Sequence, residues 1–188
     1  MVKMDSAERE DKPSKLEKPF KEEILCAACK NDTLVLGTAN GKLILLDIST
    51  NKHISEPVRI GGENQTVNKV VAIPNIDKDL FLVVVDNKEL YFFDAKESIT
   101  RPIDFTANLD SKYHDGKICN IQVSQNSKFF AIGILDRAFG IFKLDKETLK
   151  VEQPKKWVTK VSLFLLAYEI LVQICRLQNG CAYVERYV

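Results

Sequence analysis

The sequence has few of the residues from which catalytic and cofactor sites are usually built. It has two histidines, one tryptophan and eight glycines among 188 residues. The glycines are scattered, and none forms a G-x-G-x-x-G motif or a P-loop, which excludes the common phosphate-binding loops. We therefore expect a protein that is not an enzyme, with no catalytic residue, no metal and no cofactor.

The sequence also lacks an excess of either charge sign. It has 27 Lys and Arg residues and 26 Asp and Glu residues, and the net charge is +1. This balance does not require nucleic acid or an anionic membrane as a partner. The first 23 residues lack the apolar run of a signal peptide. We expect a nuclear or cytoplasmic protein with no membrane attachment. Its five cysteines should then be free thiols, because these compartments are reducing.

Residues 1–22 are poor in apolar side chains and mix both charge signs with serine and two prolines. Such a segment buries too little apolar surface to offset the entropy lost on ordering. We predict a flexible charged tail there.

From residue 23 onward, short apolar runs alternate with polar turns. The runs are Ile24–Cys29, Leu34–Gly37, Leu43–Ile48, Val67–Ile73, Leu80–Val85, Leu90–Phe93, Ile118–Val123, Phe129–Ile134 and Phe139–Leu144. Each has the length of a strand and is bounded by turn-forming residues. The pattern predicts an all-β fold.

Three pairs of runs form a repeat that aligns without gaps. The repeated units are Leu36–Asp47, Val83–Asp94 and Ile132–Lys143. Asn40, Asn87 and Asp136 hold the same position, 47 and then 49 residues apart. Another apolar run precedes each unit, so each repeat has room for about four strands. A period above ~40 residues with four strands is typical of propeller blades.

The units resemble WD40 repeats. Leu46-Asp47 and Phe93-Asp94 stand where that family has its Trp-Asp dipeptide, and Phe142-Lys143 is a weaker version. Tyr113-His114 lies near the usual Gly-His position. The resemblance implies a structural, hydrogen-bonding role for His114 rather than a catalytic one.

The resemblance also gives a role to the turn position of each repeat. Asp136 matches the structural aspartate of the turn between the second and third strands, and Asn40 and Asn87 replace it with an amide. The resemblance implies about three WD40-like propeller blades over residues 23–160. Propellers close their ring with about 4–8 blades. We therefore expect an incomplete ring with two open edges, which favours aggregation or dependence on a partner.

A narrower resemblance covers residues 117–160. The stretch is similar to an early blade of the non-catalytic WD40 subunit of eukaryotic tRNA (guanine-N7) methyltransferase. The similarity lies in the Ser124-x-x-Ser127-Lys128 turn, Asp136, the Ile141-Phe142 ending and the basic Lys155-Lys156-Trp157 segment. It implies a regulatory subunit that supports a separate catalytic subunit and helps it hold tRNA.

The basic segment near residue 157 is the candidate contact with RNA or a partner. Lys155, Lys156 and Lys160 surround Trp157, and such a cluster can contact phosphates and stack on a base. The alternative is a solvated loop with Trp157 packed against a blade.

Residues 161–188 depart from the blade pattern. The apolar stretch Val161–Cys175 contains Glu169 and Gln173 and is shorter than the ~20 residues of a membrane span. It would suit the first strand of a next blade or a short apolar helix. The hypothesis that we favour is a translated intron in a truncated isoform, since Lys160-Val161-Ser162 can be encoded by a sequence that reads as a splice donor.

Cys26-x-x-Cys29 is a weak candidate for metal or thiol chemistry. The two residues are three apart, so in a strand their side chains point to opposite faces. We expect buried structural cysteines there and at Cys119.

Four functions remain open. The leading one is a scaffold that supports a tRNA methyltransferase. A generic protein-interaction adaptor without an RNA role is the alternative. An enzyme that uses Cys26 and Cys29, and membrane attachment through Val161–Leu177, complete the set.

Overall fold

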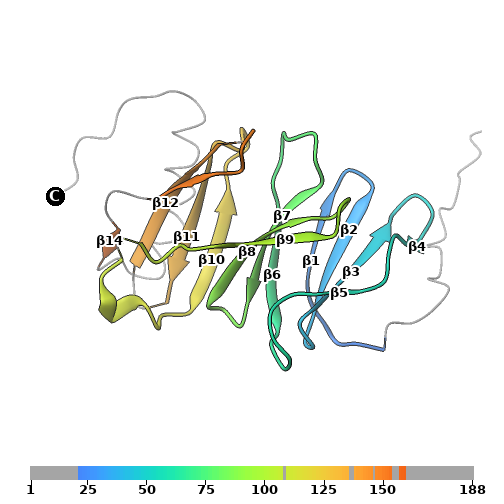
Figure 1. Cartoon of the computed structure of the whole chain (residues 1–188), viewed down its shortest axis with the longest axis horizontal. Coiled ribbons are helices and arrows are strands. Elements are labelled where there is room, and N and C mark those ends of the chain that lie inside the picture. Colours follow the sequence, from blue (N-terminus) through green and yellow to red (C-terminus); the bar gives the residue numbers. More distant parts are fainter. Residues whose placement is uncertain (1–20, 108, 136–137, 146, 154–156, 160–188) are drawn as a thin grey trace, which may run out of the picture.

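The computed structural model describes residues 21–107, 109–135, 138–145, 147–153 and 157–159. These residues form three antiparallel sheets that stand side by side (Figure 1). The helical structure among them is one short 3-10 turn, Ser111–Tyr113. The expectation of an all-β fold is confirmed.

Each sheet has four strand positions, and neighbouring strands follow one another in chain order. The first sheet contains β1 (Ile24–Lys30), β2 (Thr33–Thr38), β3 (Lys42–Asp47), β4 (Lys52–His53) and β5 (Val58–Arg59). The second contains β6 (Val67–Ala72), β7 (Leu80–Val85), β8 (Glu89–Asp94) and β9 (Ile99–Ile103). The third contains β10 (Ile118–Val123), β11 (Phe129–Ile134), β12 (Ala138–Leu144), β13 (Val151–Glu152) and β14 (Val158–Thr159). In the first and third sheets, two short strands share the fourth position.

All nine predicted strands are present, and none is displaced by more than one residue at either end. For the fourth strands, the sequence predicted only that each repeat has room for one, without assigning its residues. In the first and third sheets they are two residues long, which is too short for a periodic pattern.

The three sheets repeat one another in detail. The first strand of each sheet has a register shift near its start, at Ile24/Cys26, Val67/Lys69 and Ile118/Asn120. A β-bulge of this kind bends and twists a strand locally. The sequence repeat therefore corresponds to a structural repeat.

An aspartate closes the turn after the third strand of each sheet. The Asp47 carboxylate accepts from the Ser49 hydroxyl at 2.6 Å and the Thr50 N–H at 3.0 Å. Asp94 accepts from the N–H groups of Lys96 and Glu97 at 3.1 and 3.3 Å. Because short polar side chains that bond the backbone two or three residues on favour turns, these positions are structural.

The third sheet departs from the expected alignment at this turn. Lys143 pairs with Phe129 at the register position where Asp47 pairs with Thr33, as the alignment predicts. The turn carboxylate, however, is that of Asp145, which accepts from the N–H groups of Glu147 and Thr148. The aspartate role thus moves two residues along the chain.

The first strands of the sheets lie next to one another. β6 of the second sheet packs against β1 and β2 on one side and approaches β10 on the other. In the first and third sheets, the later strands lie progressively farther from this inner row (Figure 1).

Two apolar layers fill the spaces between the sheets. Along β7, Phe81, Val83 and Val85 face the first sheet, whereas Leu82 and Val84 face the third. All six residues of β7 are buried, because both faces of the sheet are covered. This explains why the sequence Leu80–Val85 is continuously apolar rather than alternating.

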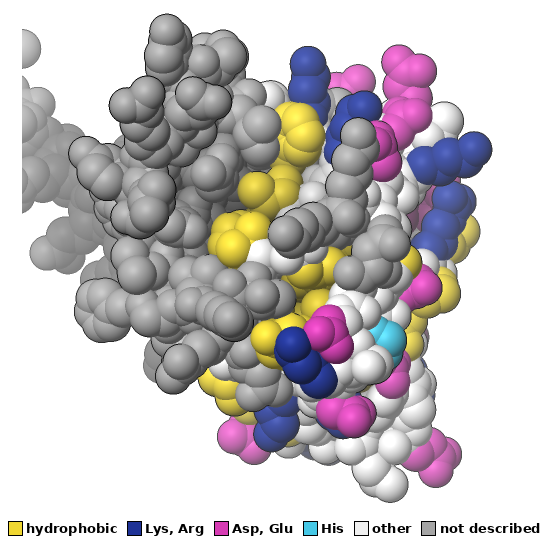
Figure 2. All heavy atoms as spheres, turned by 90° about the vertical axis from the view of Figure 1, so that its left-hand side faces the viewer, with side chains coloured by type: hydrophobic (Ala, Val, Ile, Leu, Met, Phe, Trp, Pro, Cys, Tyr) yellow, Lys and Arg dark blue, Asp and Glu magenta, His cyan; other side chains and the backbone are white. Residues whose placement is uncertain are grey.

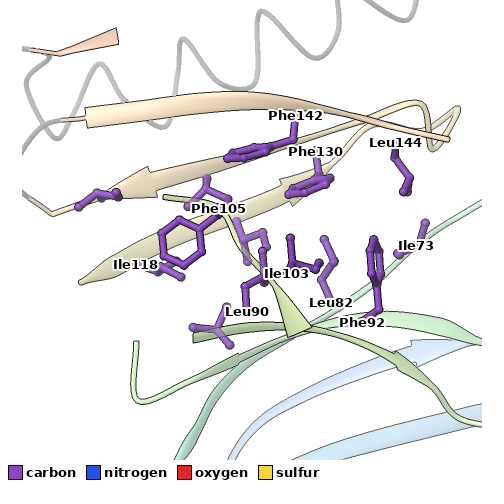
Figure 3. Packing of buried hydrophobic residues seen from close by; sticks show 14 of the residues in the cluster. Ile73, Leu82, Leu90, Phe92, Ile103, Phe105, Ile118, Phe130, Phe142 and Leu144 are labelled. Carbon is purple, nitrogen blue, oxygen red and sulfur yellow. The ribbon is translucent and has the colours of Figure 1, made fainter. Parts of the chain in front are cut away.

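The layer between the second and third sheets is the larger one. Phe130 and Phe142 stack with ring centroids 4.9 Å apart and face Leu82, Leu90 and Phe92 across the layer (Figure 3). Full burial of one such side chain stabilises a fold by about 1.5–3 kcal/mol. The second and third sheets are therefore held together mainly by this layer.

Candidate functional site

Two ends of the sheet stack carry the turns, and side-chain hydrogen bonds order the turns at both ends. We call the end with the turns β1–β2, β6–β7 and β10–β11 the first-turn end. The opposite end carries the turns β2–β3 and β7–β8 and the segments that lead into β6 and β10.

Lys30 fastens the first two sheets at the first-turn end. Its side chain is 9% exposed, and its ammonium donates to the carbonyl of Ile76 at 2.8 Å and to that of Lys78. Burial lowers the pKa of Lys30, and the nearby Asp79 partly opposes that shift. The lysine therefore works as a link between sheets, and its charge is not available for a ligand.

The neighbouring residues strengthen the same link. Asn31 donates to the Asp79 carboxylate at 2.7 Å, and the Thr33 hydroxyl donates to its other oxygen at 3.2 Å. On the far side of the β6–β7 turn, the Ser127 hydroxyl donates to the carbonyl of Pro74. The first-turn end is thus a continuous row of turns held by side chains.

At the opposite end, the turn aspartate of the second sheet is not at the expected position. Asp86 accepts from both the N–H and the hydroxyl of Thr66, at 2.7 and 3.0 Å. The Asn87 N–H donates to the amide oxygen of Asn68 at 2.7 Å. In this repeat, the turn carboxylate stands one position before Asn87, and Asp136 lies outside the described residues.

His114 has a local contact. Its Nε2 lies 2.9 Å from the carbonyl oxygen of Leu109, in the connection between β9 and β10. This bond orders the connection, in agreement with the structural role that we expected.

The two cysteines of the Cys26-x-x-Cys29 motif face opposite ways, as predicted. Cys26 is half-buried against the layer between the first two sheets, and burial raises the pKa of its thiol. Cys29 is exposed, so the expectation that it is buried was wrong. It projects from the face of β1 that the neighbouring sheet does not cover. Cys119 is half-buried, and burial likewise raises the pKa of its thiol.

In the described ranges, no cluster of three or more His, Cys, Asp or Glu side chains is placed to hold a metal ion. Cys26, Cys29 and Cys119 are all free thiols. The raised pKa values of Cys26 and Cys119 work against nucleophilic chemistry at neutral pH, since the thiolate is the reactive form.

Trp157 is packed against the third sheet and is 4% exposed. Its ring meets Phe142 edge-on at 5.6 Å between centroids, and a Cβ on Gly140 would come within 3.1 Å of it. This burial leaves no ring face for a nucleobase. Lys155, Lys156 and Lys160 lie outside the described residues, so the predicted contact of these lysines with RNA or a partner stays a prediction.

An open groove beside the third sheet is the candidate partner site. It has a volume of about 690 Å³ and runs along the edge formed by β12, β13 and the turn between them. Its charged lining is Lys128, Lys143, Lys150, Asp145, Glu147 and Glu152. An apolar strip of Phe129, Leu144 and Val151 lies between these charges.

The charges of the groove are partly paired. The Lys143 ammonium lies 3.2 Å from the Glu152 carboxylate, and both side chains are more than half exposed. An exposed pair of this kind contributes little to stability, so both groups remain available to a partner. The groove could not be predicted from the sequence, because it forms where residues 128–129 lie next to residues 143–152 in the fold.

No helix in the described part of the chain has the length and hydrophobicity needed to cross a membrane. The stretch Val161–Leu177, considered above for membrane attachment, lies outside that part.

Neither the models of known protein families nor the curated proteins compared with this chain give a match. The chain is therefore defined by its architecture, an all-β protein of three antiparallel sheets, each four strand positions deep.

Proposed function

We propose that this chain is a non-catalytic interaction scaffold whose three sheets are WD40-like propeller blades. The observation that carries the proposal is the row of first strands, in which β6 packs against β1 and approaches β10. In a propeller, four-stranded blades stand around a central channel with their first strands innermost. The shared strand order and the shared bulge in each sheet support the same interpretation.

The way in which the turns are held supports the scaffold role. Lys30 and Ser127 link neighbouring sheets at the first-turn end, and Asp86 orders the β7–β8 turn within the second sheet. Rigid elements that present fixed turns suit the binding of other molecules, since little entropy is lost when they are engaged. The groove along β12 and β13 is the proposed contact surface for a protein partner.

The specific partner that we propose is the catalytic subunit of a tRNA (guanine-N7) methyltransferase, with tRNA bound jointly. The support is the resemblance over residues 117–160. In the turn of that segment, Ser124 accepts from the Phe129 N–H at 3.0 Å and donates to Asn126 at 2.8 Å. The serines of the matching turn thus have a defined structural role.

A second candidate is a protein-interaction adaptor without an RNA role. The burial of Trp157 favours it, because the one tryptophan of the chain is not free to stack on a base. In that case the groove would bind a protein, and the lysines near residue 156 would not contact nucleic acid.

Capture experiments with and without nuclease distinguish the two candidates. The tagged full chain is incubated with the methyltransferase catalytic subunit and tRNA, each alone and both together. Retention of the catalytic subunit together with nuclease-sensitive retention of tRNA supports the methyltransferase role. If neither is retained, that role is wrong, and partners captured independently of nuclease support the adaptor.

A matched pair of variants tests the groove. Lys143→Glu with Lys150→Glu reverses two charges in the groove, whereas Lys52→Glu with Lys96→Glu reverses two exposed charges in β4 and in the β8–β9 turn. We expect the first pair to weaken partner capture at least tenfold and the second pair to leave it unchanged. Equal effects of the two pairs would contradict the assignment of the groove.

A further inference from the structure

The fourth strands of the sheets form outer edges that are closed to the addition of a further strand. In β9, Pro102 has no N–H to donate, and Arg101 adds an exposed charge. In the first and third sheets, the fourth position is held by strands of two residues, and Pro57 stands between β4 and β5. Prolines, charges and short strands are features by which natural sheets prevent the pairing of an edge with another chain. The outer rim of the stack is therefore a poor surface for an extended partner.

The inner edge of the first sheet lacks all three of these features. Its strand β1 is seven residues long, and the stretch Ile24–Cys29 contains neither a proline nor a charged residue. In the ranges that the structure describes, β1 pairs with β2 alone and is the edge strand on this side of its sheet. A long, apolar edge strand is a template for pairing with another chain.

Of the three first strands, β1 is also the most exposed. Every second residue from Leu25 to Cys29 is exposed, whereas each residue of β6 and β10 is buried or half-buried. Leu25 is 42% exposed. The inner edges of the second and third sheets are therefore less accessible than that of the first.

The register of β1 shows which of its backbone groups point toward this free edge. Lys30 pairs with Thr33 across a two-residue turn, and the pair that closes such a turn exchanges hydrogen bonds. Hydrogen-bonded and non-hydrogen-bonded pairs alternate along an antiparallel ladder. The N–H and C=O groups of Ala27 and Cys29 are therefore directed away from β2. They offer a row of donors and acceptors that only an extended backbone can match.

The side chains of β1 leave one of its faces open beside this edge. β6 covers the face that carries Cys26 and Ala28, and the Cys26 thiol donates to the carbonyl of Val67 at 3.4 Å. Leu25, Ala27 and Cys29 alternate with these residues and lie on the other face. The first sheet stands at one end of the row of sheets (Figure 1), so neither of the other two sheets covers that face.

The side of the molecule at the third sheet has a different surface. Among its described residues, charged side chains of both signs are spread over that side (Figure 2). A surface of this kind suits a charged partner, whereas the free edge of β1 suits an uncharged one.

We propose that β1 is a strand-addition site, at which an extended, uncharged segment of a partner protein pairs with the free edge and lengthens the first sheet by one strand. In this mode of binding, main-chain hydrogen bonds supply affinity and alternate side chains supply specificity. Leu25, Ala27 and Cys29 favour apolar side chains on the same face of the incoming strand. The proposal rests on the scaffold role and adds a contact separate from the groove along β12 and β13.

A labelled strand peptide tests the site with the full chain. The probe alternates threonine and valine over the length of β1, carries a lysine at each end for solubility, and is labelled with fluorescein. We expect saturable binding in fluorescence anisotropy. Hydrogen exchange at the amides of Ala27 and Cys29 should slow several-fold in the complex, and exchange at Thr100 in β9 should stay unchanged.

Substitutions then separate the edge of β1 from the other edges. Ala27→Pro removes a donor that points away from β2, and it should weaken peptide binding about tenfold, as expected for the loss of a main-chain hydrogen bond. Thr100→Pro is the matched control, because Thr100 lies two residues from Pro102 on the outer side of β9 and its loss should leave binding unchanged. Cys29→Lys keeps the backbone intact, places a charge beside the edge and should also weaken binding. Tryptophan fluorescence verifies that each variant is folded.

Several results would overturn the proposal. They are the absence of saturable binding to the unchanged chain, equal binding by the Ala27→Pro and Thr100→Pro variants, and protection that appears in β9 instead of β1. A dimer of the unchanged chain that Ala27→Pro dissociates would make a second copy the occupant, in place of a partner protein. The peptide assay needs neither the methyltransferase subunit nor tRNA. If the peptide binds and the subunit is not captured, the proposed partner is wrong and the strand-addition site stands.

Discussion

The carboxylate of Asp86 accepts two hydrogen bonds from Thr66, one from its N–H at 2.7 Å and one from its hydroxyl at 3.0 Å. The two residues are 20 positions apart in the chain. They join the β7–β8 turn of the second sheet to the segment that enters β6. A third bond, from the Asp86 N–H to the Thr66 carbonyl at 2.9 Å, makes the junction reciprocal.

Replacing Asp86 should destabilise this junction in steps. Asp86→Asn keeps the one oxygen that accepts both bonds but removes its charge, and asparagine tolerates the positive φ of 49° found here, so we expect a loss of about 1 kcal/mol. Asp86→Ala removes both side-chain bonds and should lose about 2–3 kcal/mol. Urea unfolding monitored by the fluorescence of the one tryptophan measures both. Equal stabilities of the two variants would contradict a role for the carboxylate.

The nine main strands could be predicted from the sequence because each is an apolar run bounded by turn residues. The contacts between sheets could not, because they join residues far apart in the chain. Lys30 illustrates this, since a lysine next to Asn31 and Asp32 resembles an ordinary solvated turn residue. Its burial depends on the carbonyls of Ile76 and Lys78, more than 40 positions away.

The position of the turn carboxylate in the third sheet, at Asp145 instead of residue 143, could not be predicted from the sequence repeat either. An alignment without gaps assumes that the third strands of all repeats have equal length, and β12 is one residue longer than β3 or β8. Trp157 was considered both as an RNA contact and as a packing residue, and sequence could not decide between them. The decision depends on Gly140, whose missing side chain leaves room for the ring.

The environment of Trp157 can be measured directly, because the chain has one tryptophan. We expect its emission to be blue-shifted and resistant to iodide in the folded protein, because the side chain is 4% exposed. Adding tRNA should leave the emission unchanged, since the ring has no free face. Strong iodide quenching of the folded protein would contradict the packing described here.

The contact between Gly140 and Trp157 should be sensitive to small changes in volume. Gly140→Ala introduces a Cβ within 3.1 Å of the indole ring, and overpacking of this kind loses about 1–3 kcal/mol. Trp157→Ala should lose about 3–5 kcal/mol, the usual range for removing a buried large aromatic side chain. Gly62→Ala is the control, because a Cβ there meets no atom closer than 3.6 Å. Chemical unfolding of the three variants provides the comparison.

Lys30 should give the fold a pH dependence in alkaline solution. Burial lowers its pKa in the folded state below 10.5, so between those two pKa values the unfolded chain binds more protons than the folded one. Stability from this residue therefore rises as pH increases through the folded pKa toward 10.5. Lys30→Met keeps the apolar stem and should remove this rise. Unfolding curves at pH 7 to 10 for both chains, with exposed Lys96→Met as the control, test the prediction.

Tyr91 should ionise at a higher pH than a free tyrosine does. Its hydroxyl donates to the Glu89 carboxylate at 2.5 Å, and burial, followed by that carboxylate, raises the pKa of Tyr91 to about 12. Because the folded pKa lies above the unfolded value of 10, the stability that the neutral phenol contributes is present below pH 10 and is lost between pH 10 and 12. Ultraviolet titration should show a late-ionising phenol that disappears in Tyr91→Phe and shifts to lower pH in Glu89→Gln. A titration unchanged by Glu89→Gln would mean that the carboxylate does not hold the proton on Tyr91.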